Sequence, residues 1–192
     1  MNSKKKSVFV IGPRLSVHLN ELAGNYGAGV SMIFAGTDET DLKKYTAGKK
    51  LIVNEAIRDF YIDESILFMN QKEFDDLRLA IEYLLNDHKS IIVVFMTGDP
   101  LSLALTPMLA QAADKLGIDP SFVGVKTEQE DDRVTGENLS YFLKNRYRLY
   151  LIEKIDNKYS LQANEEGPTD ELLKSVINSV VKSFKQAEQK LK

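Results

Sequence analysis

Three short segments combine glycine with hydroxyl, carboxylate or guanidinium side chains, and each follows an apolar run rich in β-branched residues. They are residues 12–16 (GPRLS), 36–41 (GTDETD) and 97–102 (TGDPLS). Glycine lets backbone N–H groups approach an anion closely, and the free N–H groups at a helix start attract negative charge. We therefore interpret the three segments as one candidate site for an anion or a nucleotide.

Eight residues of these segments carry the candidate chemistry. They are Gly12, Arg14, Thr37, Asp38, Thr97, Gly98, Asp99 and Ser102. A guanidinium such as that of Arg14 binds phosphate through two parallel hydrogen bonds, although a plain surface arginine is the simpler interpretation. Thr97, Asp99 and Ser102 could contact a ligand at a helix N-terminus, but capping of that helix alone explains Asp99 and Ser102 and is the simpler interpretation.

The other polar residues indicate neither a metal site nor a catalytic group. The acidic run Glu128, Glu130, Asp131 and Asp132 could bind Mg²⁺ through carboxylate oxygens, but a charged loop is usually only solvated. The two histidines, His18 and His88, are far apart in the sequence and form no recognisable triad. The absence of cysteine excludes disulfides, thiol catalysis and thiolate metal ligands. We expect no catalytic residue and no metal.

The elements that position these segments alternate between strands and helices. Apolar patterns predict strands over 8–11, 30–35, 91–96, 121–125, 149–152 and 158–161, with a turn at Asp119-Pro120. Helical patterns cover 71–86, 102–116 and 138–144, and a last helix begins near Thr169. This order predicts an α/β fold, a three-layer doubly wound and mainly parallel sheet of the Rossmann-like kind. Such sheets bind ligands beyond the carboxyl ends of their strands, where the three segments lie.

Composition favours one globular domain that binds neither nucleic acid nor membrane. The chain has 192 residues, 43% of them hydrophobic, and its 25 basic and 28 acidic residues give a net charge of −3. No apolar run approaches the length of about 20 residues that a membrane span requires. We expect a cytoplasmic protein.

Three regions divide the chain. Residues 1–7 read as a disordered basic tail, residues 8–163 as the α/β domain, and residues 164–192 as a hinge and an amphipathic helix. We expect this helix to pack on the domain, although a free partner-binding helix is the alternative. Its apolar stripe consists of Leu172, Leu173, Val176, Ile177, Val180, Val181 and Phe184.

From about Val8 into the last helix, the chain resembles the N-terminal nucleotide-binding domain of the FtsZ/tubulin superfamily. In that family the first strand leads into a glycine-rich loop that ends in asparagine, a place that residues 11–20 occupy here. The second strand leads to Asn-Thr-Asp, which Thr37 and Asp38 match. The signature loop Gly-Gly-Gly-Thr-Gly-Thr-Gly corresponds to residues 98–102, and the helix that follows has the family's proline at Pro107.

The departures from this family concern the phosphate loops. Leu15, Pro100 and Leu101 stand where glycines would let backbone N–H groups reach a phosphate, and proline has no N–H at all. We expect residues 13–16 to present side chains to the crevice and Leu101 to crowd a phosphate. Family members hydrolyse GTP with an acidic loop that follows the central helix, and this chain ends at Lys192, before such a loop.

The resemblance therefore implies a degenerate, truncated relative that acts through protein contacts, at a filament or in cell division, without GTP turnover. No cofactor is expected, and GTP or GDP would bind weakly at most. The expected partner is another protein or a second copy of the chain, such as a full-length filament-forming relative. The alternative is a nucleotide-binding or small-molecule-binding module, or an enzyme, that uses Arg14, Asp38, Asp99 and Ser102.

Overall fold

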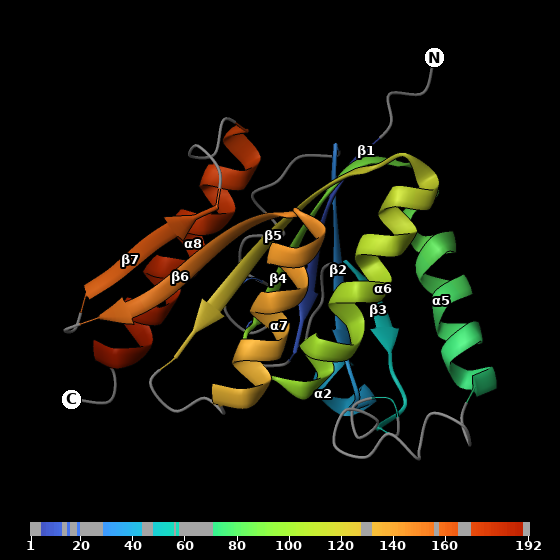
Figure 1. Cartoon of the computed structure of the whole chain (residues 1–192), viewed down its shortest axis with the longest axis horizontal. Helices are drawn as coiled ribbons and strands as arrows, with labels where there is room; N and C mark the ends of the chain where they lie inside the picture. The colour runs from blue at the N-terminus through green and yellow to red at the C-terminus, as the bar shows by residue number, and fades with distance from the viewer. Residues whose placement is uncertain are drawn as a thin grey trace.

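The computed structural model describes residues 5–12, 15, 19, 29–43, 48–55, 57, 71–127, 132–155, 158–164 and 170–189. Within these ranges one seven-stranded sheet runs through the molecule in the order β3-β2-β1-β4-β5-β6-β7 (Figure 1). The strands are β1 (Lys5–Ile11), β2 (Val30–Gly36), β3 (Lys49–Ile52), β4 (His88–Met96), β5 (Asp119–Lys126), β6 (Arg148–Ile155) and β7 (Lys158–Ala163). The first six strands in chain order pair in parallel, and β7 pairs antiparallel with β6.

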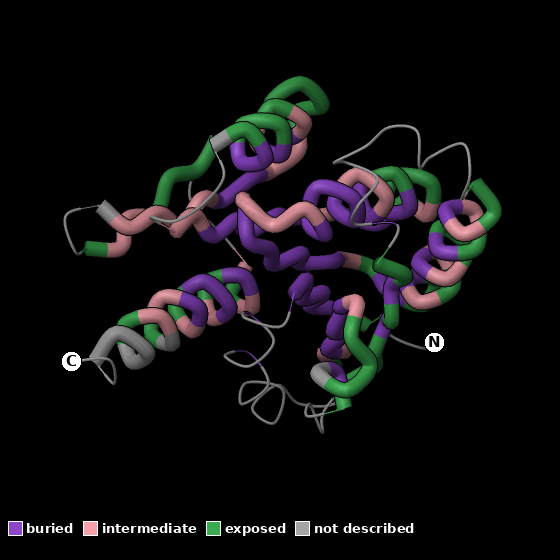
Figure 2. Tube along the Cα trace, turned by 90° about the horizontal axis from the view of Figure 1, so that it is seen from below, coloured by how far each residue is buried: buried purple, intermediate pink, exposed green. Residues whose placement is uncertain are grey.

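Helices cover both faces of this sheet. They are α2 (Glu39–Lys43), α5 (Gln71–Leu85), α6 (Pro100–Leu116), α7 (Asp132–Asn145) and α8 (Glu171–Gln189). Helices α5, α6 and α7 lie on one face, and α8 lies on the other (Figure 2). The predicted α/β class, a three-layer doubly wound and mainly parallel sheet, is confirmed. None of the helices in the described ranges is long and apolar enough to cross a membrane.

The second half of the central strand β1, residues 8–11, is apolar at every position because both of its faces are buried. Phe9 and Ile11 belong to the core beneath α5, α6 and α7. Val8 and Val10 belong to the opposite core, which includes the apolar stripe of α8. Because successive side chains of a strand point to opposite faces, a strand covered on both sides must be apolar at every position.

The strand order has a topological switch point between β1 and β4. From β1 the chain proceeds outward to β2 and β3, and it then returns to add β4, β5 and β6 on the other side of β1. Sheets of this topology bind ligands at the carboxyl ends of the two strands at such a switch point, a place that we call the crevice. The segments 12–16 and 97–102 begin on its two sides.

Packing of α7 places its first half close to this crevice. The ring of Phe142 contacts Phe122 of β5 at a centroid distance of 4.6 Å and Phe95 of β4 at 5.4 Å. Phe142 thereby fixes α7 over β4 and β5. Residues one turn earlier on α7 can then reach the loop after β4.

The amino-terminal strand and α7 begin earlier than predicted. Lys5–Ser7, expected in a tail, belong to β1, where the Lys6 N–H donates to the carbonyl of Gly29 at 3.1 Å and the Lys6 ammonium pairs with Asp170. Helix α7 begins at Asp132 and not at Asn138. In both cases charged residues next to apolar ones obscured the start of the element.

Two further predictions need correction, and two short elements were missed. The residues Asp119-Pro120, expected as a turn, begin β5, and Pro120 lies in register with Ile91 of β4. The short elements β3 and α2 were not predicted, because an edge strand of four residues with two lysines has little apolar pattern. Asn164, expected in a hinge, hydrogen-bonds to β6, where its N–H donates to the Leu149 carbonyl at 3.2 Å.

Candidate functional site

The loops after β1 and β4 meet where Gly12 faces Asp99. Gly12 has a φ of +90°, and its N–H donates to the carbonyl of Ala35 at 2.9 Å. A Cβ atom at Gly12 would lie 3.0 Å from Oδ2 of Asp99. Both the positive φ and this close approach require glycine, so Gly12 is a structural turn that brings the backbone against a carboxylate.

Asp99 caps α6 with the same carboxylate group. Its backbone is extended, and Oδ1 accepts a hydrogen bond from the N–H of Leu101 at 3.0 Å. Pro100 occupies the first helical position and has no N–H. The helix start at the crevice, which would otherwise attract an anionic ligand, therefore already holds the carboxylate of its own capping residue.

Thr97 belongs to the buried framework beneath the crevice. It is fully buried, and its N–H and hydroxyl both donate to the carbonyl of Val125, at 3.0 and 3.4 Å. Its own carbonyl accepts a hydrogen bond from Nδ2 of Asn138 at 2.8 Å. A Cβ atom at Gly124 would lie 3.0 Å from Cγ2 of Thr97, so β5 needs glycine there to admit the threonine.

Ser102 lies inside the first turn of α6 and does not cap it. The residue is fully buried, and its Oγ has no hydrogen-bond partner in the described structure. Gly98 is half-buried and links Thr97 to Asp99. Of the two residues expected as N-cap candidates, Asp99 therefore has that position.

Thr37 and Asp38 follow β2, one strand away from the crevice between β1 and β4. Thr37 is half-buried and Asp38 is exposed. Oδ1 of Asp38 accepts a hydrogen bond from the N–H of Thr40 at 2.6 Å, so this carboxylate caps the short helix α2. Two neighbouring helix starts at this edge of the sheet thus carry carboxylates as caps.

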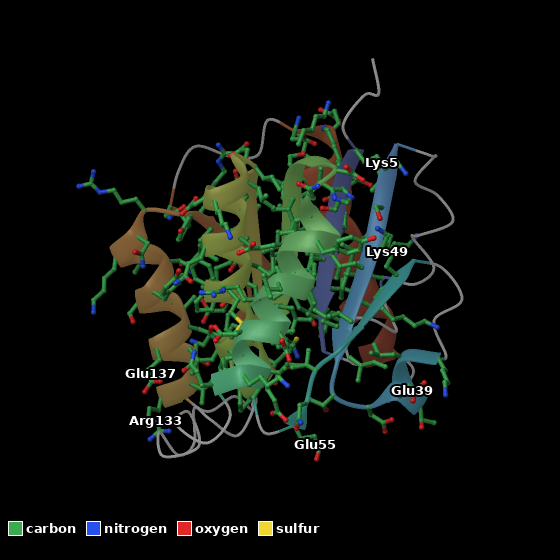
Figure 3. The ribbon with its side chains drawn as sticks, turned by 90° about the vertical axis from the view of Figure 1, so that its right-hand side faces the viewer. Lys5, Glu39, Lys49, Glu55, Arg133 and Glu137 are labelled. Atoms are coloured by element: carbon green, nitrogen blue, oxygen red, sulfur yellow. The ribbon has the colours of Figure 1, made fainter. Side chains whose placement is uncertain are left out.

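Several cations at the same edge are paired with acidic side chains. Lys43 bridges to Glu39 at 2.9 Å, Arg133 to Glu137 at 3.8 Å, and Lys126 to Glu153 at 2.9 Å. In Figure 3 Glu39, Glu55, Arg133 and Glu137 lie at the end of the molecule where the strands finish, and Lys5 lies at the opposite end. These pairs reduce the positive charge available to a phosphate.

The leucines of the two loops do not lie where we expected. Leu15 is fully buried in the core on the α8 face and presents no side chain to the crevice. Leu101 is 3% exposed and packs in the core beneath α5, α6 and α7, so it does not crowd a phosphate. The hydrophobic effect favours burial of both apolar side chains in the core. The group that stands at the helix start is the Asp99 carboxylate.

Several predicted residues lie outside the described ranges or away from the crevice. Arg14, His18 and the acidic residues 128–131 are outside the description, and only the backbone of Asp132 is included in it. The described residues contain no group of three or more acidic, histidine or cysteine side chains that could hold a metal. His88 is buried at the start of β4, at the opposite end of the sheet, and burial lowers its pKa.

Asn138 and Gly124 support the site but were not predicted to do so. Asn138 is 1% exposed and lies on the buried stripe of α7 between Val134 and Phe142, at intervals of four residues. A polar residue on an apolar stripe signals a specific hydrogen bond. Recognising Asn138 as such a residue requires knowing that α7 begins at Asp132, and the sequence pattern predicted a start at Asn138.

The chain is similar in fold to solved structures of FtsZ and TubZ proteins. No protein-family model matches the chain, and no curated sequence matches it significantly. An empty FtsZ dimer from M. jannaschii matches with a TM-score of 0.62 and 15% identity, covering 94% of this chain and 53% of that one. TubZ from Clostridium botulinum phage c-st matches with a TM-score of 0.59 and 16% identity, covering 82% and 53%. A TubZ protofilament from Bacteriophage PhiKZ matches with a TM-score of 0.57 and 15% identity, covering 93% and 54%.

These matches confirm the resemblance at the level of the fold. The chain spans little more than half the length of these three proteins. Because the sequence identity is only 15 to 16%, the structural match establishes a shared architecture and does not establish an activity. The 192-residue chain therefore has an FtsZ/tubulin-like fold.

Proposed function

We propose that this FtsZ/tubulin-like domain acts through contacts with other protein subunits and does not turn over GTP. The observation that carries the proposal is the position of the Asp99 carboxylate. One of its oxygens caps α6 and the other faces Gly12 across the crevice. This is the helix start at which the fold would place an anionic ligand.

A negative charge on Asp99 opposes phosphate binding at this helix start. Two unit negative charges about 4 Å apart repel each other by about 4 kcal/mol at an effective dielectric constant of about 20. Since about 1.4 kcal/mol corresponds to a tenfold change in affinity, a thousandfold loss of affinity is about the upper limit of this effect, and the other interactions of Asp99 lower it. Pro100, which has no N–H, and Leu101, whose N–H already binds Asp99, weaken the site further.

Contacts with other subunits are supported by the proteins of similar fold and by the surface of α5. The similar FtsZ structure is a dimer, and one of the TubZ structures is a protofilament. On this chain, Leu79 and Tyr83 lie four residues apart on α5 and are 58% and 83% exposed. Neighbouring exposed apolar side chains of this kind contribute readily to a protein interface.

Sedimentation and phosphate release together test the proposal. The association state of the purified chain is measured by analytical ultracentrifugation over a range of concentrations, with and without GTP and Mg²⁺. We expect concentration-dependent association that GTP does not change, and no phosphate release. Association that requires GTP, or phosphate release that rises with protein concentration, would contradict the proposal, as would a strictly monomeric chain.

A further inference from the structure

His88 lies at the start of β4, at the end of the sheet opposite the crevice. It is 3% exposed, and neither of its ring nitrogens has a hydrogen-bond partner in the described structure. It pairs in register with Lys5 of β1. Ser7, two residues further along β1, is fully buried, and its hydroxyl also has no partner among the described residues. Because buried polar groups are normally hydrogen-bonded, both side chains point to water or a ligand as their partner.

Two lysines share this face of the sheet. Lys5 begins β1 and Lys49 begins β3 (Figure 3). Lys5 has the same strand parity as Phe9, and Lys49 lies in register with Ile33, so both lysines project to the face that α5 covers. Both are exposed, and neither forms an ion pair with another described residue.

The groups around His88 leave a surplus of positive charge. Burial is the largest influence on the pKa of His88 and lowers it. The Leu85 carbonyl at the end of α5 and the Asp87 carboxylate raise this pKa, whereas the ammonium groups of Lys49 and Lys5 lower it. At neutral pH two ammonium groups and one carboxylate therefore act on a neutral ring. This balance repels a metal cation and favours an anion.

We propose that this end of the sheet binds a tetrahedral oxyanion of the phosphate class between Lys5 and Lys49, and that His88 takes up a proton when the anion binds. The two ammonium groups supply charge-assisted hydrogen bonds at the surface. The ring nitrogen of His88 that carries a lone pair takes its proton from water, and the resulting imidazolium attracts the anion from below. The site is separate from the crevice, and the proposal does not depend on Asp99.

Anion binding and protonation of His88 favour each other. The bound anion offsets the repulsion by Lys5 and Lys49, so it raises the pKa of His88. By linkage, the chain with protonated His88 binds the anion more tightly by the same factor. Binding should therefore strengthen as the pH falls below about 6.5, where an imidazole begins to take up its proton. At higher pH the two lysines act without the imidazolium.

The test uses sulfate, because its charge stays constant over a pH range in which phosphate changes its own charge. Sulfate is titrated into the full chain at constant ionic strength, maintained with chloride, and the ring signals of His88 are followed by NMR. The His88→Gln variant identifies these signals. We expect a dissociation constant of about 1 to 10 mM at about pH 5.5, at least about fivefold tighter than at about pH 7.5. The pKa of His88 should be higher in sulfate than in chloride.

Three lysine variants and His88→Gln identify the groups that bind. Lys5→Gln and Lys49→Gln should each weaken sulfate binding at least about fivefold. Lys158→Gln is the matched control, because Lys158 is also exposed and also begins a strand, β7, at the other end of the sheet. It should leave the affinity unchanged. His88→Gln should bind sulfate equally at both pH values, since the group that takes up the proton is absent.

The ring of His88 reports only on this end of the sheet, so an anion in the crevice does not affect the readout. A His88 titration that is the same in sulfate and in chloride would overturn the proposal, and water alone would then account for the unpartnered groups. Equal losses from Lys158→Gln and Lys49→Gln would also overturn it, because they would show unspecific attraction. Both readouts use exposed lysines or the unmodified chain, so they do not depend on the folding of His88→Gln.

A free anion and a lipid headgroup offer the same phosphate chemistry, and vesicles distinguish them. Phosphatidic acid carries a phosphate monoester, and phosphatidylcholine vesicles with and without it are sedimented with the chain. Cosedimentation that requires phosphatidic acid and is lost in Lys49→Gln would support the site and identify a lipid as the source. A sulfate response without cosedimentation would support the site and identify a free anion.

Discussion

Substitution of Gly12 by alanine tests the contact on which the account depends. Gly12 has a φ of +90°, and a Cβ atom there would lie 3.0 Å from Oδ2 of Asp99. Alanine therefore meets two separate obstacles, a backbone angle that it rarely adopts and a carboxylate oxygen at its van der Waals limit. The free energy of unfolding should fall for both reasons.

A second glycine separates the two contributions. Gly117, which ends α6, has a φ of +63° and nothing within 4 Å of its Cβ position, so Gly117→Ala measures backbone strain alone. That strain costs about 1 to 2 kcal/mol. Crowding in a packed site adds about 1 to 3 kcal/mol, which gives a total of about 2 to 5 kcal/mol for Gly12→Ala.

Urea unfolding followed by circular dichroism measures both variants. With an m-value of about 2 kcal/mol/M, Gly12→Ala should lower the midpoint by about 1 to 2.5 M, and Gly117→Ala by about 0.5 to 1 M. In the Asp99→Ser background, which keeps an N-cap but removes the facing oxygen, the extra cost at Gly12 should disappear. If Gly12→Ala is no more destabilising than Gly117→Ala, the close approach of Gly12 and Asp99 is refuted.

Three further predictions concern packing and pH. Leu173→Ala on α8 removes a side chain that is 2% exposed and should cost about 2 to 5 kcal/mol in urea unfolding, whereas the exposed Lys182→Ala should change stability by less than about 0.5 kcal/mol; equal effects would contradict the packing of α8 on the sheet. Burial lowers the pKa of His88 below its ordinary value of 6.5, so the unfolded chain takes up the proton first. The stability of the unmodified chain relative to His88→Gln should therefore be constant above pH about 6.5 and fall as the pH drops below it, and a difference that does not vary with pH would refute this. Burial alone would raise the pKa of Asp170, but hydrogen bonds from Lys6 and from two N–H groups of α8 lower it below 3.8. The stability lost in Asp170→Asn should be present above pH about 4 and vanish as the pH falls further, and a loss that persists in acid would count against the ion pair.

The sequence predicted the central strands and helices because the apolar residues of each element follow a pattern that is visible without knowledge of its neighbours. The strands β1, β2 and β4 are apolar on both faces, and α5 and α8 have apolar stripes that need no knowledge of their neighbours. The strand β3 and the first turns of α7 have no such pattern. Their positions depend on pairing with β2 and on the packing of Phe142 against the sheet.

The candidate site was predictable in its location and not in its details. Parallel strand order alone places residues 12, 37–38 and 97–102 at one edge of the sheet. The carboxylate of Asp99 faces Gly12, which lies 87 positions earlier in the chain, and only the pairing of β1 with β4 reveals that contact. The role expected of Leu101 was wrong for the same reason, since its side chain turns into a core formed by distant residues.

The most direct measurement of the central claim is calorimetric titration of GTP into the unmodified chain and into Asp99→Asn, at matched and low ionic strength. The account predicts binding no tighter than about millimolar for the unmodified chain, equivalent to about −4 kcal/mol, and tighter binding for Asp99→Asn. Micromolar binding by the unmodified chain, equivalent to about −8 kcal/mol, would contradict the claim that the Asp99 carboxylate keeps triphosphates out of the crevice. Unchanged weak binding in Asp99→Asn would show that something other than this carboxylate closes the site.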